Sequence, residues 1–120
     1  MRGERNLIIK EKRSKMIRHG VPYTNENGYI DDGLLTDLPE EEQKLVLEWI
    51  RDKIRPIKSV NIRHSSYGMK HILEHDTDIY LTNNQFKHAM LISGYEPDNA
   101  RRLNWLFRIS EKSPAFRNNR

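Results

Sequence analysis

The chain has 120 residues, 36% of them hydrophobic and 32% charged, with a formal net charge of +4, which fits one small domain whose modest core a homodimer would supplement. Cysteine is absent, so disulfides and thiolate metal sites are excluded and a reducing compartment is favoured. No apolar run approaches the roughly 20 residues that cross a bilayer, so we expect a cytoplasmic protein with no membrane partner.

The charge is divided into blocks of alternating sign. Residues 1–25 carry +5, residues 26–50 carry −7, residues 51–75 carry +4, residues 76–100 carry −3 and residues 101–120 carry +5. If the fold brings the three basic blocks together, they form a basic face suited to nucleic acid. If they pack against the acidic blocks instead, the surface has mixed sign, as in many soluble proteins.

Residues 1–37 are expected to form a basic arm followed by a turn-rich segment. The first 20 residues hold seven Lys or Arg and indicate a short helix, a strand, or an arm that becomes ordered on a partner. Asn27-Gly28 and Asp32-Gly33 favour left-handed backbone, which glycine adopts readily because it has no Cβ. These turns predict either a small hairpin or a linker.

Residues 38–55 predict a helix. Pro39 suits a first turn, and Glu40–Glu42 lie at the positive end of the helix dipole. Apolar residues then recur at helical spacing and make one face: Leu45, Val46, Trp49, Ile50 and Ile54. Pro56 ends the helix at Arg55, because the residue before a proline avoids helical backbone.

A second helix is predicted from Ser65 or Ser66, either of which is a good N-cap, to about His75. Its core face is made by Met69, Ile72 and Leu73. Gly68 weakens a helix interior by up to about 1 kcal/mol relative to alanine. Its presence therefore indicates close packing or close approach by a partner.

A third helix is predicted from Thr82, because Thr82–Gln85 has the pattern of a capping box, and Gly94 ends it. Together with the preceding helix it resembles a helix-turn-helix layout. In that layout the start of the third helix presents Asn83, Asn84 and Lys87. Amides read adenine edges and helix N-termini bind phosphate, although the same amides are also ordinary capping residues.

Residues 103–110 alternate between apolar and more polar positions, which predicts a strand that pairs with Ile79–Leu81. A helix over residues 99–109 is the alternative. Residues 112–120 are expected to be a disordered basic tail. The predicted fold is α+β: a small, mainly helical single domain over residues 38–111, with a helix-turn-helix-like pair and a minor β element.

The candidate binding residues after the first helix are basic and lie beside a histidine and an aromatic residue: Lys58, Arg63, His64, Tyr67 and Lys70. Such side chains suit a phosphate backbone. A solvated basic face that balances the glutamates of the first helix explains them equally well. The acidic residues that precede that helix or begin it are candidates for docking a basic partner: Asp31, Asp32, Glu40 and Glu41.

His71, Glu74 and His75 spell H-x-x-E-H, a zinc-protease pattern that places both histidines on one helical face. No third ligand is evident downstream, and inverzincin domains are far larger than this chain. Phosphate-binding loops, nucleophile elbows and dinucleotide fingerprints are also absent from the sequence. We therefore expect no catalytic residues, metal or cofactor, and a zinc-dependent hydrolase remains an alternative only if metal is bound.

Residues 38–113 resemble small, mostly uncharacterised proteins of prophages, plasmids and integrative elements of Gram-positive bacteria. The strings that carry the resemblance are LPEEEQKLVLEWI, IRPIK, HSSYGMKHILE, IYLTNNQFKHAMLISGY and LNWLFRISEKS. The resemblance implies an accessory protein of a mobile element in a bacterial host cell. Proteins of that kind tend to be DNA-binding regulators or inhibitors of host defences, including anti-CRISPRs. The expected partner is thus nucleic acid or a host nucleoprotein complex.

Overall fold

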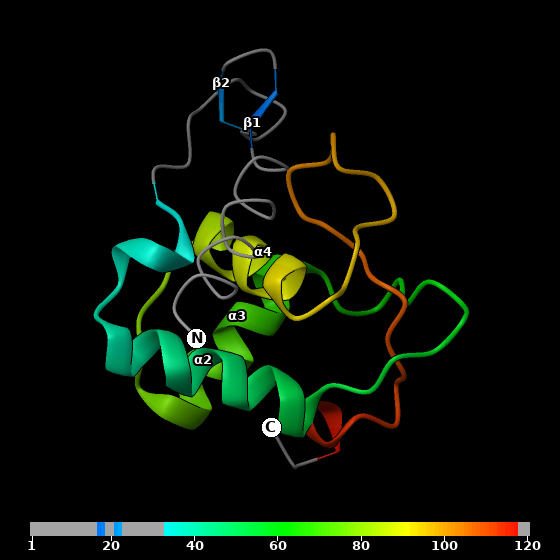
Figure 1. The fold of residues 1–120 in the computed structure, drawn as a ribbon. Helices are drawn as coiled ribbons and strands as arrows, with labels where there is room; N and C mark the ends of the chain where they lie inside the picture. Colours follow the sequence, from blue (N-terminus) through cyan, green and yellow to red (C-terminus); the bar gives the residue numbers. More distant parts are fainter. Residues whose placement is uncertain (1–16, 19–20, 23–32, 118–120) are drawn as a thin grey trace.

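The computed structural model describes residues 17–18, 21–22 and 33–117 (Figure 1). Within these residues, three α-helices pack around one core, and short 3₁₀ turns lie on either side of them in the sequence. The helices are α2 (Glu40–Lys53), α3 (Ser66–Thr77) and α4 (Asn83–Ile92), the 3₁₀ turns are η1 (Leu35–Asp37) and η2 (Pro114–Phe116), and the two-residue strands are β1 (Ile17–Arg18) and β2 (Val21–Pro22). The two strands are antiparallel, with Ile17 opposite Pro22.

Helix α2 confirms the helix predicted over residues 38–55 and is two residues shorter at each end. Pro39 is its N-cap, and Glu40–Glu42 occupy its first turn. Val46 and Ile50 are fully buried and Trp49 is 5% exposed. The Trp49 indole N–H donates to Asp76 Oδ2 at 2.8 Å, which ties α2 to the end of α3.

Helix α3 begins at the predicted cap, since the Ser65 hydroxyl accepts a hydrogen bond from the Gly68 N–H. It ends at Asp78, which adopts left-handed backbone with φ of 61°, a conformation that aspartate tolerates better than most residues. A Cβ placed on Gly68 meets nothing within 4 Å. Close packing within the fold therefore does not explain this glycine, and the surface beside it is open.

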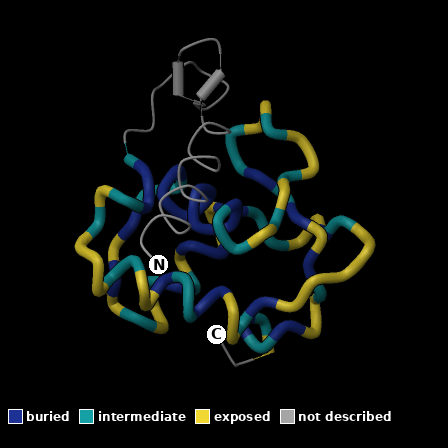
Figure 2. The backbone as a smooth tube through the Cα atoms, viewed as in Figure 1, coloured by how far each residue is buried: buried dark blue, intermediate teal, exposed yellow. Residues whose placement is uncertain are grey.

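Helix α4 begins with the predicted capping box between Thr82 and Gln85, and Gly94 follows its end with φ of 95°. Unlike an ordinary surface helix, α4 is buried on every side (Figure 2). Its polar side chains contact other segments of the same polypeptide. The Leu35 N–H donates to His88 Nδ1 at 2.9 Å, and Asn84 donates to the Gly33 carbonyl at 2.8 Å. This burial makes α4 the centre of the described fold.

The predicted strand over residues 103–110 is wrong. Within residues 33–117 the structure contains no strand, only a single antiparallel bridge between Pro56 and Ile109. Trp105, Phe107 and Ile109 are each at most 1% exposed, so the alternation reflects an extended segment with one buried side. Its hydrogen-bond partner is an irregular loop rather than Ile79–Leu81. The described domain is therefore mainly helical, without the predicted minor β element.

Both predicted domain boundaries also need correction. Leu34 and Leu35 are 7% and 1% exposed and belong to the core, so the packed domain starts before residue 38. In the predicted disordered tail, Ser113 and Ala115 are fully buried and η2 packs against α2. Residues 118–120, the segment 23–32 for which a hairpin or a linker was predicted, and most of the predicted basic arm lie outside the described residues. Among the helices that are described, none has the length and apolarity of a membrane span.

Candidate nucleic-acid interface

Two basic stretches that lie far apart in the sequence run side by side in the structure. The Ser110 N–H donates to the Arg55 carbonyl at 2.7 Å, and the Ile57 N–H donates to the Arg108 carbonyl at 3.1 Å. The Asn61 N–H continues the contact to the Phe107 carbonyl at 2.9 Å. The basic block of residues 51–75 is therefore joined directly to that of residues 101–120 (Figure 1).

Asn61 holds this pairing in place from inside the loop. Its Oδ1 accepts hydrogen bonds from the N–H groups of Arg63 and His64, at 2.8 and 3.2 Å. Its Nδ2 donates to the Ile109 carbonyl at 3.3 Å and to Glu111 Oε1 at 3.1 Å. One buried amide thus fixes both the turn that presents Arg63 and the segment opposite it.

His64 fastens the end of the loop to the C-terminal segment. Its ring stacks on Phe116, with the centroids 3.7 Å apart and the planes 1° from parallel. Its Nε2 lies 3.0 Å from Glu111 Oε2. The hydrogen bond with His64 and, next, that with Asn61 hold the pKa of Glu111 below its ordinary value of 4.5. His64, predicted to contact the partner, is thus half-buried and structural.

The depressed pKa of Glu111 predicts a pH dependence of stability. The carboxylate stabilises the fold above pH 4.5, and this contribution is lost as the pH falls through the lower pKa of the folded state. Glu111→Gln should therefore lower stability near pH 5.5 by under about 1 kcal/mol, because the Glu111 carboxylate is exposed and its interactions are screened by solvent. Thermal melts of both proteins between pH 5.5 and 3 should converge at the acid end, and a constant difference would contradict the prediction.

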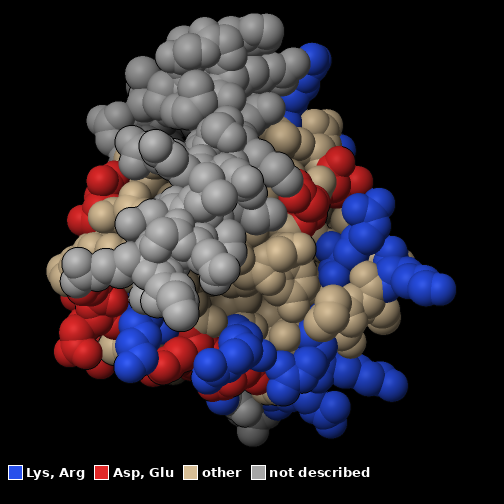
Figure 3. Space-filling view, viewed as in Figure 1, with Lys and Arg blue, Asp and Glu red and all other residues tan. Residues whose placement is uncertain are grey.

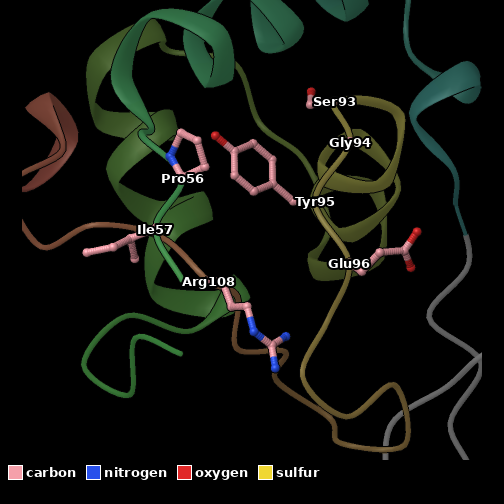
Figure 4. Close-up of a pocket in the computed structure, with 7 residues that line it drawn as sticks. All are labelled: Pro56, Ile57, Ser93, Gly94, Tyr95, Glu96 and Arg108. Carbon is pink, nitrogen blue, oxygen red and sulfur yellow. The ribbon is translucent and has the colours of Figure 1, made fainter. Parts of the chain in front are cut away.

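Two adjoining grooves cross the paired segments and share Ile57. The larger, about 410 Å³, is lined by seven residues: Pro56, Ile57, Ser93, Gly94, Tyr95, Glu96 and Arg108 (Figure 4). Tyr95 points toward Pro56 across this groove, and burial raises the pKa of its hydroxyl. The smaller, about 260 Å³, lies between residues 57–63 and the Ile109–Glu111 segment. Ile57 and Ile62 are 48% and 81% exposed, so apolar surface lies among the basic groups.

The side chains that give this region its charge are Lys58, Arg63, Arg108 and Lys112, which we call the basic surface. All four are exposed, and none forms an ion pair with another part of residues 33–117. Figure 3 shows Lys and Arg gathered toward the side that carries the paired segments, while acidic groups dominate the side where α2 begins. Acidic side chains also lie in this region, since Glu96 lines the larger groove with Arg108 and Glu111 lines the smaller groove with Arg63.

The predicted reading face of the third helix is wrong, because the structure buries it. Asn84 and Lys87 are each 1% exposed. Asn84 contacts the segment that precedes η1, and the Lys87 ammonium lies 4.9 Å from the ring centroid of Trp105. Asn83 donates to the Leu103 carbonyl at 3.2 Å and to Asn104 at 3.0 Å. The amides hold chain segments together and are not presented to a DNA groove.

The structure separates the remaining predicted residues. Tyr67 is 51% exposed on the first turn of α3, whereas Lys70, a predicted phosphate ligand, is 7% exposed and paired with Glu74 at 3.2 Å. Glu40 and Glu41 are exposed on the first turn of α2, and Figure 1 shows that this end of α2 lies on the side opposite the paired segments. Asp31 and Asp32 lie outside the described residues.

The H-x-x-E-H pattern does not form a metal site in the part of the chain that the structure describes, where no group of three metal-ligating side chains converges. Both carboxylate oxygens of Glu74 instead have partners within the protein. Its Oε1 lies 3.1 Å from His71 Nδ1, and its Oε2 accepts from Lys70 and from the Leu81 N–H. His75 is exposed. Of the motif residues, Glu74 and His71 therefore make contacts within the α3 region.

Arg108, Lys112, Ile57 and Ile62 were not among the predicted site residues. The basic block of residues 101–120 was the signal that could have identified Arg108 and Lys112. Arg108 was instead assigned to the predicted strand and Lys112 to the predicted tail. Comparisons of the chain with family models, with curated proteins and with solved structures give no match.

Proposed function

We propose that this protein acts by binding and that its basic surface contacts the phosphate backbone of nucleic acid. The observation that supports this is the backbone pairing of residues 55–61 with residues 107–110, which brings cations from two distant blocks onto one region. Four exposed cations free of ion pairs within residues 33–117 suit phosphates, because each releases condensed counterions on binding. The resemblance to mobile-element proteins gives the same expectation.

The test is a salt titration of binding to random-sequence duplex and single-stranded DNA and RNA. We expect micromolar or tighter affinity at low salt, and a fall in log K with log salt whose slope is about −0.9 per phosphate contact on duplex. The double variant Lys58→Ala/Arg63→Ala should make the slope of log K against log salt shallower, by the amount expected for about two phosphate contacts. Lys44→Ala/Arg51→Ala removes the same charge from α2 and should change the slope much less. No detectable binding at low salt would overturn the proposal.

A second candidate is an inhibitor that docks on a nucleic-acid-binding host complex. The supporting observation is the exposed acidic start of α2, where Glu40 and Glu41 lie near Leu45, itself 48% exposed. Carboxylates so presented can occupy a basic channel in place of phosphates. Glu40→Lys/Glu41→Lys should then abolish capture of a basic partner without affecting oligonucleotide binding. A helix-turn-helix regulator is the less supported alternative, because its recognition helix corresponds to the buried α4.

A further inference from the structure

Five side chains of the α3 region form a connected cluster on the open side of that helix. They are Tyr67, Lys70, His71 and Glu74 of α3 and Tyr80 of the link to α4. The Lys70 ammonium lies 5.5 Å from the Tyr67 ring centroid and 5.7 Å from that of Tyr80. His71 meets Tyr67 edge to face, with the centroids 4.5 Å apart. One lysine thus contacts both tyrosine rings.

Glu74 fixes the cluster at its base. Its side chain is 12% exposed and binds Lys70 at 3.2 Å, which holds the ammonium beside the rings. The same carboxylate accepts the Leu81 N–H at 3.1 Å, which sets the position of the neighbouring Tyr80. Its other oxygen lies 3.1 Å from His71, the ring that supports Tyr67. Two residues of the H-x-x-E-H pattern, His71 and Glu74, therefore orient the two tyrosines.

The tyrosine rings themselves are open to solvent. Tyr67 is 51% exposed and Tyr80 is 82% exposed, the highest fraction among the large apolar side chains described. Because both centroids lie within 6 Å of one ammonium, they are less than 12 Å apart. A stacked strand advances about 3.4 Å per nucleotide. The two rings are therefore close enough to contact bases about two or three nucleotides apart on one strand.

We propose that Tyr67 and Tyr80 are a stacking site for bases of single-stranded nucleic acid. This deepens the proposed function and rests on it. The cluster provides flat aromatic surface with little free charge, since Lys70 is already paired, whereas phosphate contacts need free cations. Arg63 supplies such a cation four residues before Tyr67, a distance of chain that spans at most about 14 Å. Asp78 is exposed two residues before Tyr80, so the phosphates lie on the Arg63 side.

The experiment measures binding of labelled single strands by fluorescence anisotropy, with a matched duplex and an abasic strand of equal length. Tyr67→Ala/Tyr80→Ala should weaken single-strand binding about tenfold or more, since stacking on an aromatic ring contributes measurably per base. Duplex binding and the salt slope should not change. Phe at both positions should retain affinity, and Leu, which is apolar but not flat, should lose it. The abasic strand should bind wild type and the Ala variant equally.

Circular dichroism melts of each variant separate loss of binding from loss of fold, and these exposed positions should leave the melting temperature nearly unchanged. Wild-type affinity in the Ala variant, alongside a loss in Lys58→Ala/Arg63→Ala, would overturn the stacking site and leave the proposed function standing. Absence of oligonucleotide binding by the wild-type protein would overturn both proposals. The exposed tyrosines would then belong to a contact with a protein partner.

Discussion

Glu74→Ala should destabilise the protein by about 3–5 kcal/mol, because it leaves a buried cation without its partner. Lys70 is 7% exposed and has its ammonium 3.2 Å from Glu74. The substitution also removes the acceptor of the Leu81 N–H, whose hydrogen bond connects α3 to the link before α4. Urea denaturation followed by circular dichroism should show the midpoint shift with little change in slope.

His75→Ala is the matched control, because it changes the same sequence motif at an exposed position. It should alter stability by less than about 0.5 kcal/mol. Lys70→Met/Glu74→Gln removes both charges together and should recover much of the loss, since Gln retains an acceptor for the Leu81 N–H. If the motif binds zinc instead, stoichiometric metal will be present and His75→Ala will release it, an outcome that contradicts the packing role.

Trp105→Ala should cost about 3–5 kcal/mol, a large part of the 5–15 kcal/mol typical of a whole domain. The indole is 1% exposed and packs edge to face on Phe107, with the centroids 6.2 Å apart. Its N–H donates to the Ala100 carbonyl at 3.1 Å, and the Lys87 ammonium lies 4.9 Å from its ring. Removing the indole leaves a cavity between α4 and the loop around Ala100, which precedes Trp105 in the sequence.

Tyr80→Ala provides the comparison, since it deletes a large aromatic ring that is 82% exposed. We expect a change below about 0.5 kcal/mol there, measured by the same circular dichroism signal at 222 nm. The loss of stability caused by Trp105→Phe should lie between those caused by Trp105→Ala and Tyr80→Ala. Equal stabilities for Trp105→Ala and Tyr80→Ala would mean that Trp105 does not lie in the core as the structure places it.

The helices could be predicted because their signals are local. The Ser65 cap, the Thr82–Gln85 box and the glycine after α4 each act within a few residues of the element they define. The burial of α4 on all sides was not predictable, because polar residues in a helix usually indicate a solvent-exposed face. They contact segments as distant as Gly33 and Leu35, and no local pattern reports such a contact.

The segment around Trp105 shows how far a period-two pattern can be taken. It correctly indicates extended backbone with one side buried, and Trp105, Phe107 and Ile109 are that side. It does not identify the partner, which is the irregular loop from Arg55 to Asn61. The same long-range pairing brings Arg108 next to the loop. Lys58 and Arg63 were named as candidates from their own basic block, whereas Arg108 was assigned to a strand and its charge was overlooked.

The pairing of residues 55–61 with residues 107–113 also has a consequence for synthesis. Asn61 donates to the carbonyl of Ile109, 48 residues further along the chain, and the Arg55 N–H is satisfied by Ser113, 58 residues further. During translation the ribosome synthesises residues 55–61 before it synthesises their partners in residues 107–113. Contacts between residues so far apart in the sequence also form slowly. The protein therefore acquires its proposed binding surface only after the segment around Ile109 has emerged, when α2, α3 and α4 are already available to receive it.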